Sequence, residues 1–254
     1  MIFPSSFPDK KLSLEYTLEI ACFNASSALL ASSAGADRLE ICDNLHEGGT
    51  TPSYGTIKHL KERIATPLFA MIRAKGGDFF YSEDEFAIME RDLLLFKQLG
   101  CEGVVLGFLK HDGKIDKAKT DQFVALAYPM EVTFHRAFDR AVDPLQALED
   151  IIDCGCQRIL TSGQQPNAEE GLPLLKELIH QADDRIVILP GSGVNSKNIQ
   201  AIITGTGAVE VHASVKISQP SGMHFVQQQM KERLDDTIVN IEEIRLMKAL
   251  LQSL

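Results

Sequence analysis

Four segments of this chain repeat one pattern, in which a glycine follows a helical stretch and leads into a short β-rich run. The segments are GADRLEIC from Gly35, GCEGVVLG from Gly100, GCQRILTS from Gly155 and GTGAVEVH from Gly205. Glycine is favoured just past a helix end because it adopts the left-handed conformation at little cost. The glycines lie too far apart for one strand–helix unit and at a suitable distance for two. A further strand is therefore expected in each interval.

Additional β-rich runs stand where the repeat requires them, at 17–21 (TLEIA), 68–73 (LFAMIR), 130–136 (MEVTFHR) and 185–191 (RIVILPG). Helical stretches separate the strands, and Ser82 with Glu85 predicts a capping box at the start of one helix. Eight strands alternating with helices predict an α/β fold, a (β/α)8 TIM-like barrel, with a doubly wound open sheet as the main alternative. No linker divides the chain. We expect a single domain over 1–254, with the barrel at about 15–215 and a polar loop and helix over 216–254.

Composition excludes several classes of protein. The net charge of −10 argues against a nucleic-acid partner. No apolar run is long enough for a membrane span, and the start MIFPSSFPDKKLSLEY does not resemble a signal peptide. The five cysteines form no spaced framework, which favours reduced thiols and a cytoplasmic location. No organic cofactor is indicated, and association into a homo-oligomer stays open.

Strand parity predicts which side chains point into the barrel, since alternate residues of a strand face opposite sides. Apolar residues such as Leu39 and Ile41 should face the helices. The inward candidates for a catalytic pocket are Glu19, Glu40, Arg73, His135, Glu210 and His212. We expect them at the mouth formed by the C-terminal strand ends, where TIM barrels hold their active sites.

Three inward carboxylates in one mouth require compensation, because burying an unpaired charge costs several kcal/mol. Arg73, a histidine, a proton or a metal ion could each supply it. Such crowding also raises carboxylate pKa values for acid–base catalysis. The alternative is an ion-pair network that only closes the barrel.

Two glycine-containing loops are candidates for binding an anionic group. The loop PGSGVNSKN (190–198) contains Gly191 and Gly193, and TSGQQ (161–165) contains Ser162 and Gly163. In TIM barrels, the loops after the seventh and eighth strands commonly hold phosphate through backbone amides. The alternative is that these glycines only make the turns.

The stretches GADRLEIC, EGGTTPS, GGDFFYS, TFHRAFD, RILTSG, PGSGV and EVHAS together resemble the CutC copper homeostasis family. They occur in the family's order and cover about 17–214. The resemblance implies a single-domain TIM-like barrel in the cytoplasm that is associated with copper handling and Cu(I) binding.

Two departures from the family pattern bear on that expectation. Ala74 and Lys75 replace a proline and an arginine, which removes a bidentate anion contact. The family ascribes copper binding to cysteines that end the first two strands. Here Cys42 occupies the second position, whereas Ala21 stands at the first and Cys22 follows it. Cys22 should face away from the mouth unless the strand has already ended there.

Two functions of different class remain. In the first, the protein takes part in copper homeostasis and holds Cu(I) through Cys42 and Cys22. In the second, it is an enzyme for a small anionic metabolite, with Glu40 or Glu210 as the acid–base group, His135 or His212 as its partner, and Arg73 as an anion clamp. A glutamate-rich mouth also suits a divalent cation. A scaffold for a partner protein is a third reading, which leaves the inward charges unexplained.

Overall fold

The computed structural model describes residues 15–232 and 234–254, and eight of the strands in it form one parallel sheet. These strands are β1 (Thr17–Cys22), β2 (Arg38–Ile41), β3 (Leu68–Met71), β4 (Gly103–Leu106), β5 (Glu131–Phe134), β6 (Arg158–Thr161), β7 (Val187–Pro190) and β8 (Glu210–Ala213). Their order is β7-β6-β5-β4-β3-β2-β1-β8. β7 and β8 lie side by side and nearly close the barrel. The expected TIM-like barrel is confirmed, and the open sheet is not formed.

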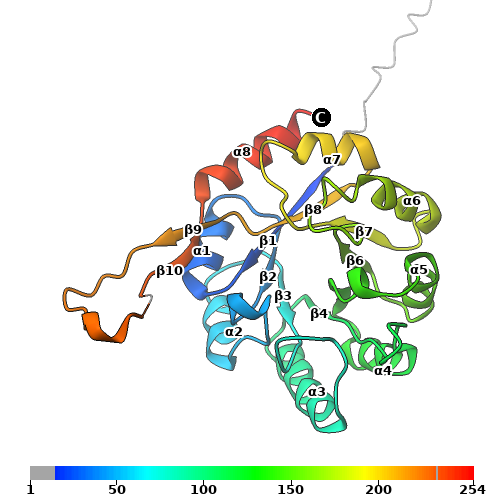
Figure 1. The fold of residues 1–254 in the computed structure, drawn as a ribbon, viewed down its shortest axis with the longest axis horizontal. Helices are drawn as coiled ribbons and strands as arrows, with labels where there is room; N and C mark the ends of the chain where they lie inside the picture. The colour runs from blue at the N-terminus through cyan, green and yellow to red at the C-terminus, as the bar shows by residue number, and fades with distance from the viewer. Residues whose placement is uncertain (1–14, 233) are drawn as a thin grey trace, which may run out of the picture.

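Helices surround the barrel, one after each strand (Figure 1). They are α1 (Ala25–Ser33), α2 (Tyr54–Lys61), α3 (Glu83–Gln98), α4 (Lys117–Ala127), α5 (Pro144–Asp153), α6 (Leu172–Ala182), α7 (Ile199–Thr206) and α8 (Ile241–Gln252). Short 3-10 turns are η1 (Leu45–Glu47), η2 (Phe138–Arg140) and η3 (Gln228–Met230). The predicted capping box of Ser82 and Glu85 starts α3. The last helix, α8, packs against α7 and α1 and so completes the outer ring.

Two apolar layers hold this architecture together. Between the sheet and the helices, one continuous core includes Leu39 and Ile41, as parity predicts. Inside the barrel, a smaller cluster consists of Cys42, Phe69, Met71 and Val105. Burial of both layers from water supplies the main driving force for folding.

The glycine repeat is confirmed at three of its four positions. Gly35, Gly100 and Gly155 have φ of +95°, +77° and +80°, the left-handed residues that end their helices. The fourth assignment is wrong, because Gly205 lies inside α7 and Gly207 takes the left-handed position with φ of +84°.

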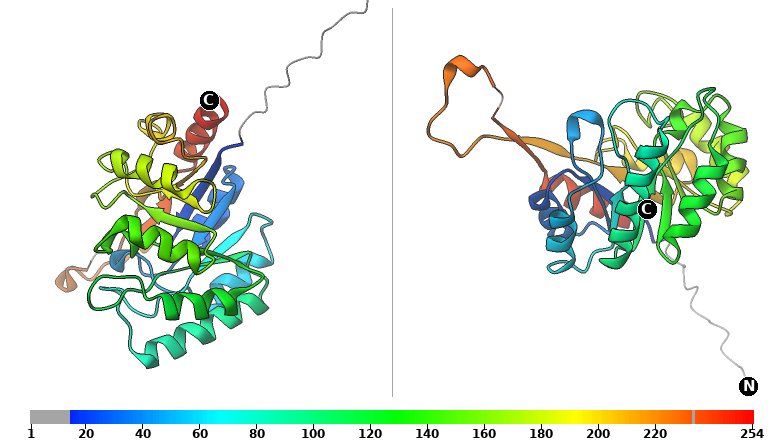
Figure 2. Two further views of the ribbon diagram at one scale, coloured as in Figure 1. Left: turned by 90° about the vertical axis from the view of Figure 1, so that its right-hand side faces the viewer. Right: turned by 90° about the horizontal axis from the view of Figure 1, so that it is seen from below.

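The region after the barrel differs from the expected polar loop. Strands β9 (Lys216–Gln219) and β10 (Asp236–Val239) pair antiparallel and form the base of an arm that projects from the barrel (Figure 2). In the described part of the chain, no helix has the length and apolarity to cross a membrane. The expectation that the start of the chain is not a signal peptide concerns a segment of which residues 1–14 lie outside the described part of the chain.

Candidate functional site

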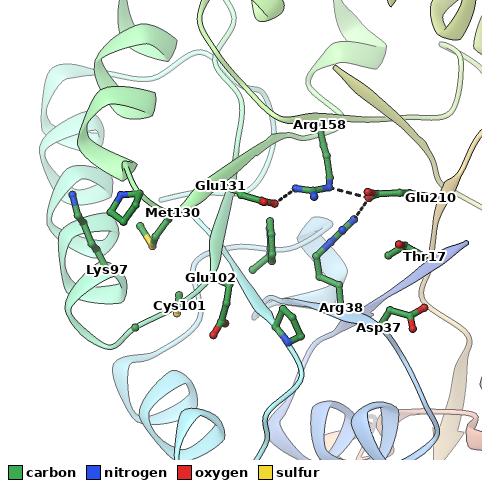
Figure 3. A pocket seen from close by; sticks show the side chains of 14 residues that line it. Thr17, Asp37, Arg38, Lys97, Cys101, Glu102, Met130, Glu131, Arg158 and Glu210 are labelled. Carbon is green, nitrogen blue, oxygen red and sulfur yellow. Dashed lines mark hydrogen bonds and ion pairs between the residues drawn. The ribbon is translucent and has the colours of Figure 1, made fainter. Parts of the chain in front are cut away.

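Two arginines and a glutamate meet inside the barrel at the N-terminal ends of the strands (Figure 3). Arg38 Nη2 and Arg158 Nε lie 2.6 and 2.9 Å from Glu210 Oε2. Both guanidinium groups also make cation–π contacts with the ring of Phe69, and their Cζ atoms lie 5.1 and 5.3 Å from its centroid. Arg158 pairs further with Glu131. These groups line a cavity of about 710 Å³ at the end of the barrel opposite the mouth.

The expected place of Glu210 at the mouth is therefore wrong. The reason is the misassigned glycine: counted from Gly207, Glu210 occupies the third position, which is the position of Arg38 and Arg158 after their own glycines. His212 then takes the fifth position, the level of Glu40. A shift of two residues keeps the inward parity but moves a side chain one layer along the barrel.

The layer above contains a histidine between two carboxyl groups. His212 Nδ1 lies 2.7 Å from Glu19 Oε1, and His212 Nε2 lies 3.8 Å from Glu40 Oε2. Glu19 is fully buried and also binds Arg38. Burial acts to raise the pKa of Glu19, but Arg38 and the hydrogen bond with His212 outweigh it and lower that pKa to about 2.

Glu40 and His212 both hold a proton more strongly than free side chains do. Burial raises the pKa of Glu40, opposed by the charge of His212 and assisted by that of Glu19. Burial acts to lower the pKa of His212, but Glu40 and Glu19 together raise it above the usual value. Among the described residues, Glu40 Oε1 has no hydrogen-bond partner. This trio can donate and accept protons at the floor of the mouth.

His135 and Arg73 line the same mouth pocket, which has a volume of about 270 Å³ and also contacts Glu40 and His212. Burial, with a contribution from Arg73, lowers the pKa of His135 to about 3, so the imidazole is neutral. Its Nδ1 accepts a hydrogen bond from the Ala137 amide at 3.2 Å, which leaves the proton on Nε2. The ring packs on Gly107, where a Cβ would lie 2.5 Å from Nδ1.

Arg73 supports the loops around the mouth and, in the described residues, pairs with no carboxylate. Its Nη1 donates to the carbonyls of Glu47 and Gly49, both at 2.7 Å, and its Nη2 donates to that of Gly77 at 2.9 Å. The guanidinium stacks on Phe79 at 5.0 Å. Lys75, at the position that departs from the family, turns away from the mouth toward Asp78 and Glu85 at the start of α3.

The structure does not bring Cys22 and Cys42 to one side of β1 and β2. Cys42 lies in the barrel interior, whereas Cys22 packs in the layer between the sheet and the helices. Burial and then the charge of Glu40 raise the pKa of Cys42 well above the usual value, and burial raises that of Cys22. Within residues 15–232 and 234–254, no three His, Cys, Asp or Glu side chains converge as a metal-binding group.

Three of the four residues expected to bind an anion use their amides in hydrogen bonds within the protein. The amides of Gly191 and Gly163 donate to Thr161, and that of Ser162 donates to Asp139. Asp139 also receives hydrogen bonds from the Ser162 hydroxyl and from Arg136. Amides of the loop after β6 are therefore satisfied by Thr161 and by Asp139, which lies in the turn after β5. Gly193, in the loop after β7, donates its amide to no other described residue.

Sequence reasoning missed four residues of this barrel interior and its rim. Arg38 and Arg158 have the same parity as the inward candidates, so extending the pattern one step toward each glycine finds them. Ser192, in the loop after β7, and Lys216, the first residue of β9, also line the mouth pocket. The repeat of the barrel strands does not identify these two, because both lie beyond the ends of those strands.

Known proteins with similar sequence or structure identify the family of the chain. The CutC family model matches residues 16–217. The copper homeostasis protein cutC homologs of Mus musculus and Homo sapiens are 48% and 46% identical over 210 residues, which is 83% of this chain and 77% of each relative. The crystal structure of the putative copper homeostasis protein CutC from Streptococcus agalactiae has 32% identity and a TM-score of 0.75, covering 78% of this chain and 98% of that one. This chain belongs to the CutC family.

Proposed function

We propose that this chain takes part in copper homeostasis, as the names of its relatives state for them, and that it holds Cu(I) at the mouth of the barrel through Cys42. The observation that carries the proposal is the place of Cys42. It is the one cysteine of the chain whose side chain joins the interior cluster, and Met71 lies in the same cluster. Cu(I) prefers thiolate and thioether sulfur. The donors present fit one Cu(I) ion bound as cargo.

The surroundings of Cys42 make binding depend on pH. Its thiol lies 3.6 Å from Glu40 Oε2, and its pKa is raised, so the sulfur carries a proton at neutral pH. A metal binds the thiolate and must displace that proton. The apparent affinity for Cu(I) should therefore increase as the pH rises. Because Cys22 belongs to the other layer, Met71 or His212 is the expected second donor.

The test is an anaerobic titration of the reduced protein with Cu(I) in the presence of a competing chelator. Cys42→Ser should abolish one-to-one binding, and Met71→Leu should weaken it. Cys101→Ser is the matched control, because Cys101 is also buried but belongs to the layer outside the barrel. Binding that survives in Cys42→Ser would refute the copper site.

A second function is favoured by a different observation, the buried Glu40, whose Oε1 has no hydrogen-bond partner among the described residues and whose pKa is raised by burial. Its carboxyl group lies beside His212 at the base of a pocket whose rim also carries Arg136 and Lys216. This arrangement suits an enzyme that transfers a proton to or from a small anionic molecule. Glu40 acts as the acid–base group, and His212, held by Glu19, stabilises its ionised form.

Deuterium exchange measures such proton transfer directly. Small organic acids and phosphate monoesters that bind the protein are incubated with it in D2O, and their C–H signals are followed by NMR. Glu40→Gln should abolish the exchange. Glu131→Gln, which alters a carboxylate at the other end of the barrel, should leave it unchanged. Failure of every bound compound to exchange would refute the enzymatic function.

A further inference from the structure

The loop after β7 presents two free backbone amides to the mouth pocket. Ser192 and Gly193 both have left-handed φ, +76° and +74°. Their carbonyls are already paired, that of Ser192 with the Ala168 amide at 2.9 Å and that of Gly193 with the side chains of Asn195 and Asn198 at 2.8 and 3.0 Å. The N–H groups of Ser192 and Gly193 donate to no described residue, and both residues line the pocket.

The backbone conformation at Ser192 is costly for a residue with a side chain. A left-handed non-glycine residue is strained, and such strain clusters at functional sites. Here the Ser192 hydroxyl donates to the Pro166 carbonyl at 2.9 Å, which fastens the loop in this form. Successive N–H groups in such a turn form a concavity that favours an anion.

The loop that carries the free amides follows β7, next to the seam where β7 and β8 form no hydrogen-bonded ladder. The sheet ends at β7 on one side and at β8 on the other, so neither edge provides carbonyl partners for the loop above it. Ser214 and Lys216 follow β8 and line the same pocket. In the described residues, the Lys216 ammonium makes no ion pair and lies 5.7 Å from the ring of Phe23.

The charge of the pocket is opposite to that of the whole chain. The chain has a net charge of −10, yet the mouth pocket is lined by Arg73, Arg136 and Lys216 and by a single carboxyl residue, Glu40. Arg136 is paired with Asp139, so Arg73 and Lys216 are the cations that pair with no carboxylate of the described residues. Glu40 holds its proton more strongly than usual, which reduces the negative charge further. A cationic pocket on an acidic protein concentrates anions from solution.

We propose that the seam between β7 and β8 binds the phosphate group of a small phosphate monoester, through the amides of Ser192 and Gly193 and the ammonium of Lys216. The tetrahedral phosphate offers separate oxygens to these donors. The organic part of the molecule then extends across the pocket to Glu40 and His212. The pocket volume of about 270 Å³ limits that part to a few carbon atoms. This inference rests on the second function proposed above, the acid–base enzyme.

Inorganic phosphate is the probe for the proposed phosphate-binding site itself. In ¹H–¹⁵N NMR of the full chain at low ionic strength, phosphate should shift the amide signals of Ser192 and Gly193 in a saturable manner. Lys216→Gln should weaken phosphate binding about tenfold, since it removes one charge-assisted hydrogen bond. Lys231→Gln is the matched control, because Lys231 is an exposed lysine of the same arm. It should leave the affinity unchanged.

Three results would overturn the proposed phosphate-binding site. They are unchanged amide signals of Ser192 and Gly193 on addition of phosphate, an equal loss of phosphate affinity in both lysine variants, or acetate binding at the same amides as tightly as phosphate. The last result would show that the site binds carboxylates. Glu40→Gln separates this inference from the proposed function, because it should abolish proton exchange and retain phosphate binding. If the wild-type protein binds phosphate but catalyses no deuterium exchange, the enzymatic function is refuted and the phosphate-binding site is retained.

Discussion

Replacing Arg38 with methionine removes the cation that holds two carboxylates inside the barrel. The methionine keeps much of the arginine stem and its packing against Phe69. Glu210 retains Arg158 as a partner, so Glu19 is the carboxylate that loses its main counter-charge. Glu19 is fully buried and Arg38 is 5% exposed. Breaking a buried ion pair by removing one partner typically costs about 3–5 kcal/mol.

We expect the lower end, about 3 kcal/mol, because His212 still binds Glu19. With an unfolding slope of about 2–3 kcal/mol/M, the midpoint in urea should fall by roughly 1–1.5 M. Circular dichroism during urea unfolding measures this shift. The control is Arg245→Met, which removes an exposed helical pair with Glu242 and should cost less than about 1 kcal/mol.

The pH dependence provides an independent check of the cause. The native pKa of Glu19 is about 2, so its ionised form stabilises the wild-type protein above pH 4.5, and this contribution is lost as the pH falls toward 2. In the variant, the pKa of Glu19 rises because the principal cause that lowers it is gone. The difference in stability between the two proteins should therefore shrink from pH 6 to pH 3. Equal midpoints for Arg38→Met and Arg245→Met, or a difference that does not depend on pH, would refute this reasoning.

Three further predictions concern single positions. The pKa of His135 is about 3 in the folded protein, so the unfolded chain takes up this proton first as the pH falls below about 6.5. His135 should therefore cost up to ~1.4 kcal/mol of stability per pH unit in this range. His135→Gln should flatten the slope of the unfolding free energy against pH, and parallel slopes for the two proteins would contradict the argument. Gly107→Ala places a Cβ against the His135 ring and should cost about 1–3 kcal/mol in thermal unfolding. In Gly55→Ala, within α2, the new Cβ meets only the Ser53 hydroxyl at an ordinary contact distance of 3.8 Å, so this variant should gain up to ~1 kcal/mol of stability. Shifts of the same sign for the two variants would contradict this prediction. Ser82→Ala removes the cap of α3 and should cost about 0.5–2 kcal/mol in urea, which an unchanged midpoint would exclude.

The sequence determined the barrel and the side of each strand that faces inward. The glycines after helices and the alternation along strands are local properties, since a helix end requires a left-handed residue and a strand repeats every two residues. The inward set from Glu19 to His212 follows from that parity, and the fold is confirmed. The arm of β9 and β10 escaped prediction because its segment is polar and contains Pro220 and Gly222, which favour loops.

Only the tertiary structure decided which inward groups meet. Arg38 reaches Glu210 across a separation of 172 residues, because closure of the barrel brings β8 beside β1. The level of each side chain along the barrel depends on where its strand starts, and Gly205 and Gly207 give the same parity but different layers. The place of the free amides beside β8 likewise depends on closure. Periodicity along a chain specifies a direction for each side chain, whereas neighbours inside a barrel are specified by register and closure, which no local pattern encodes.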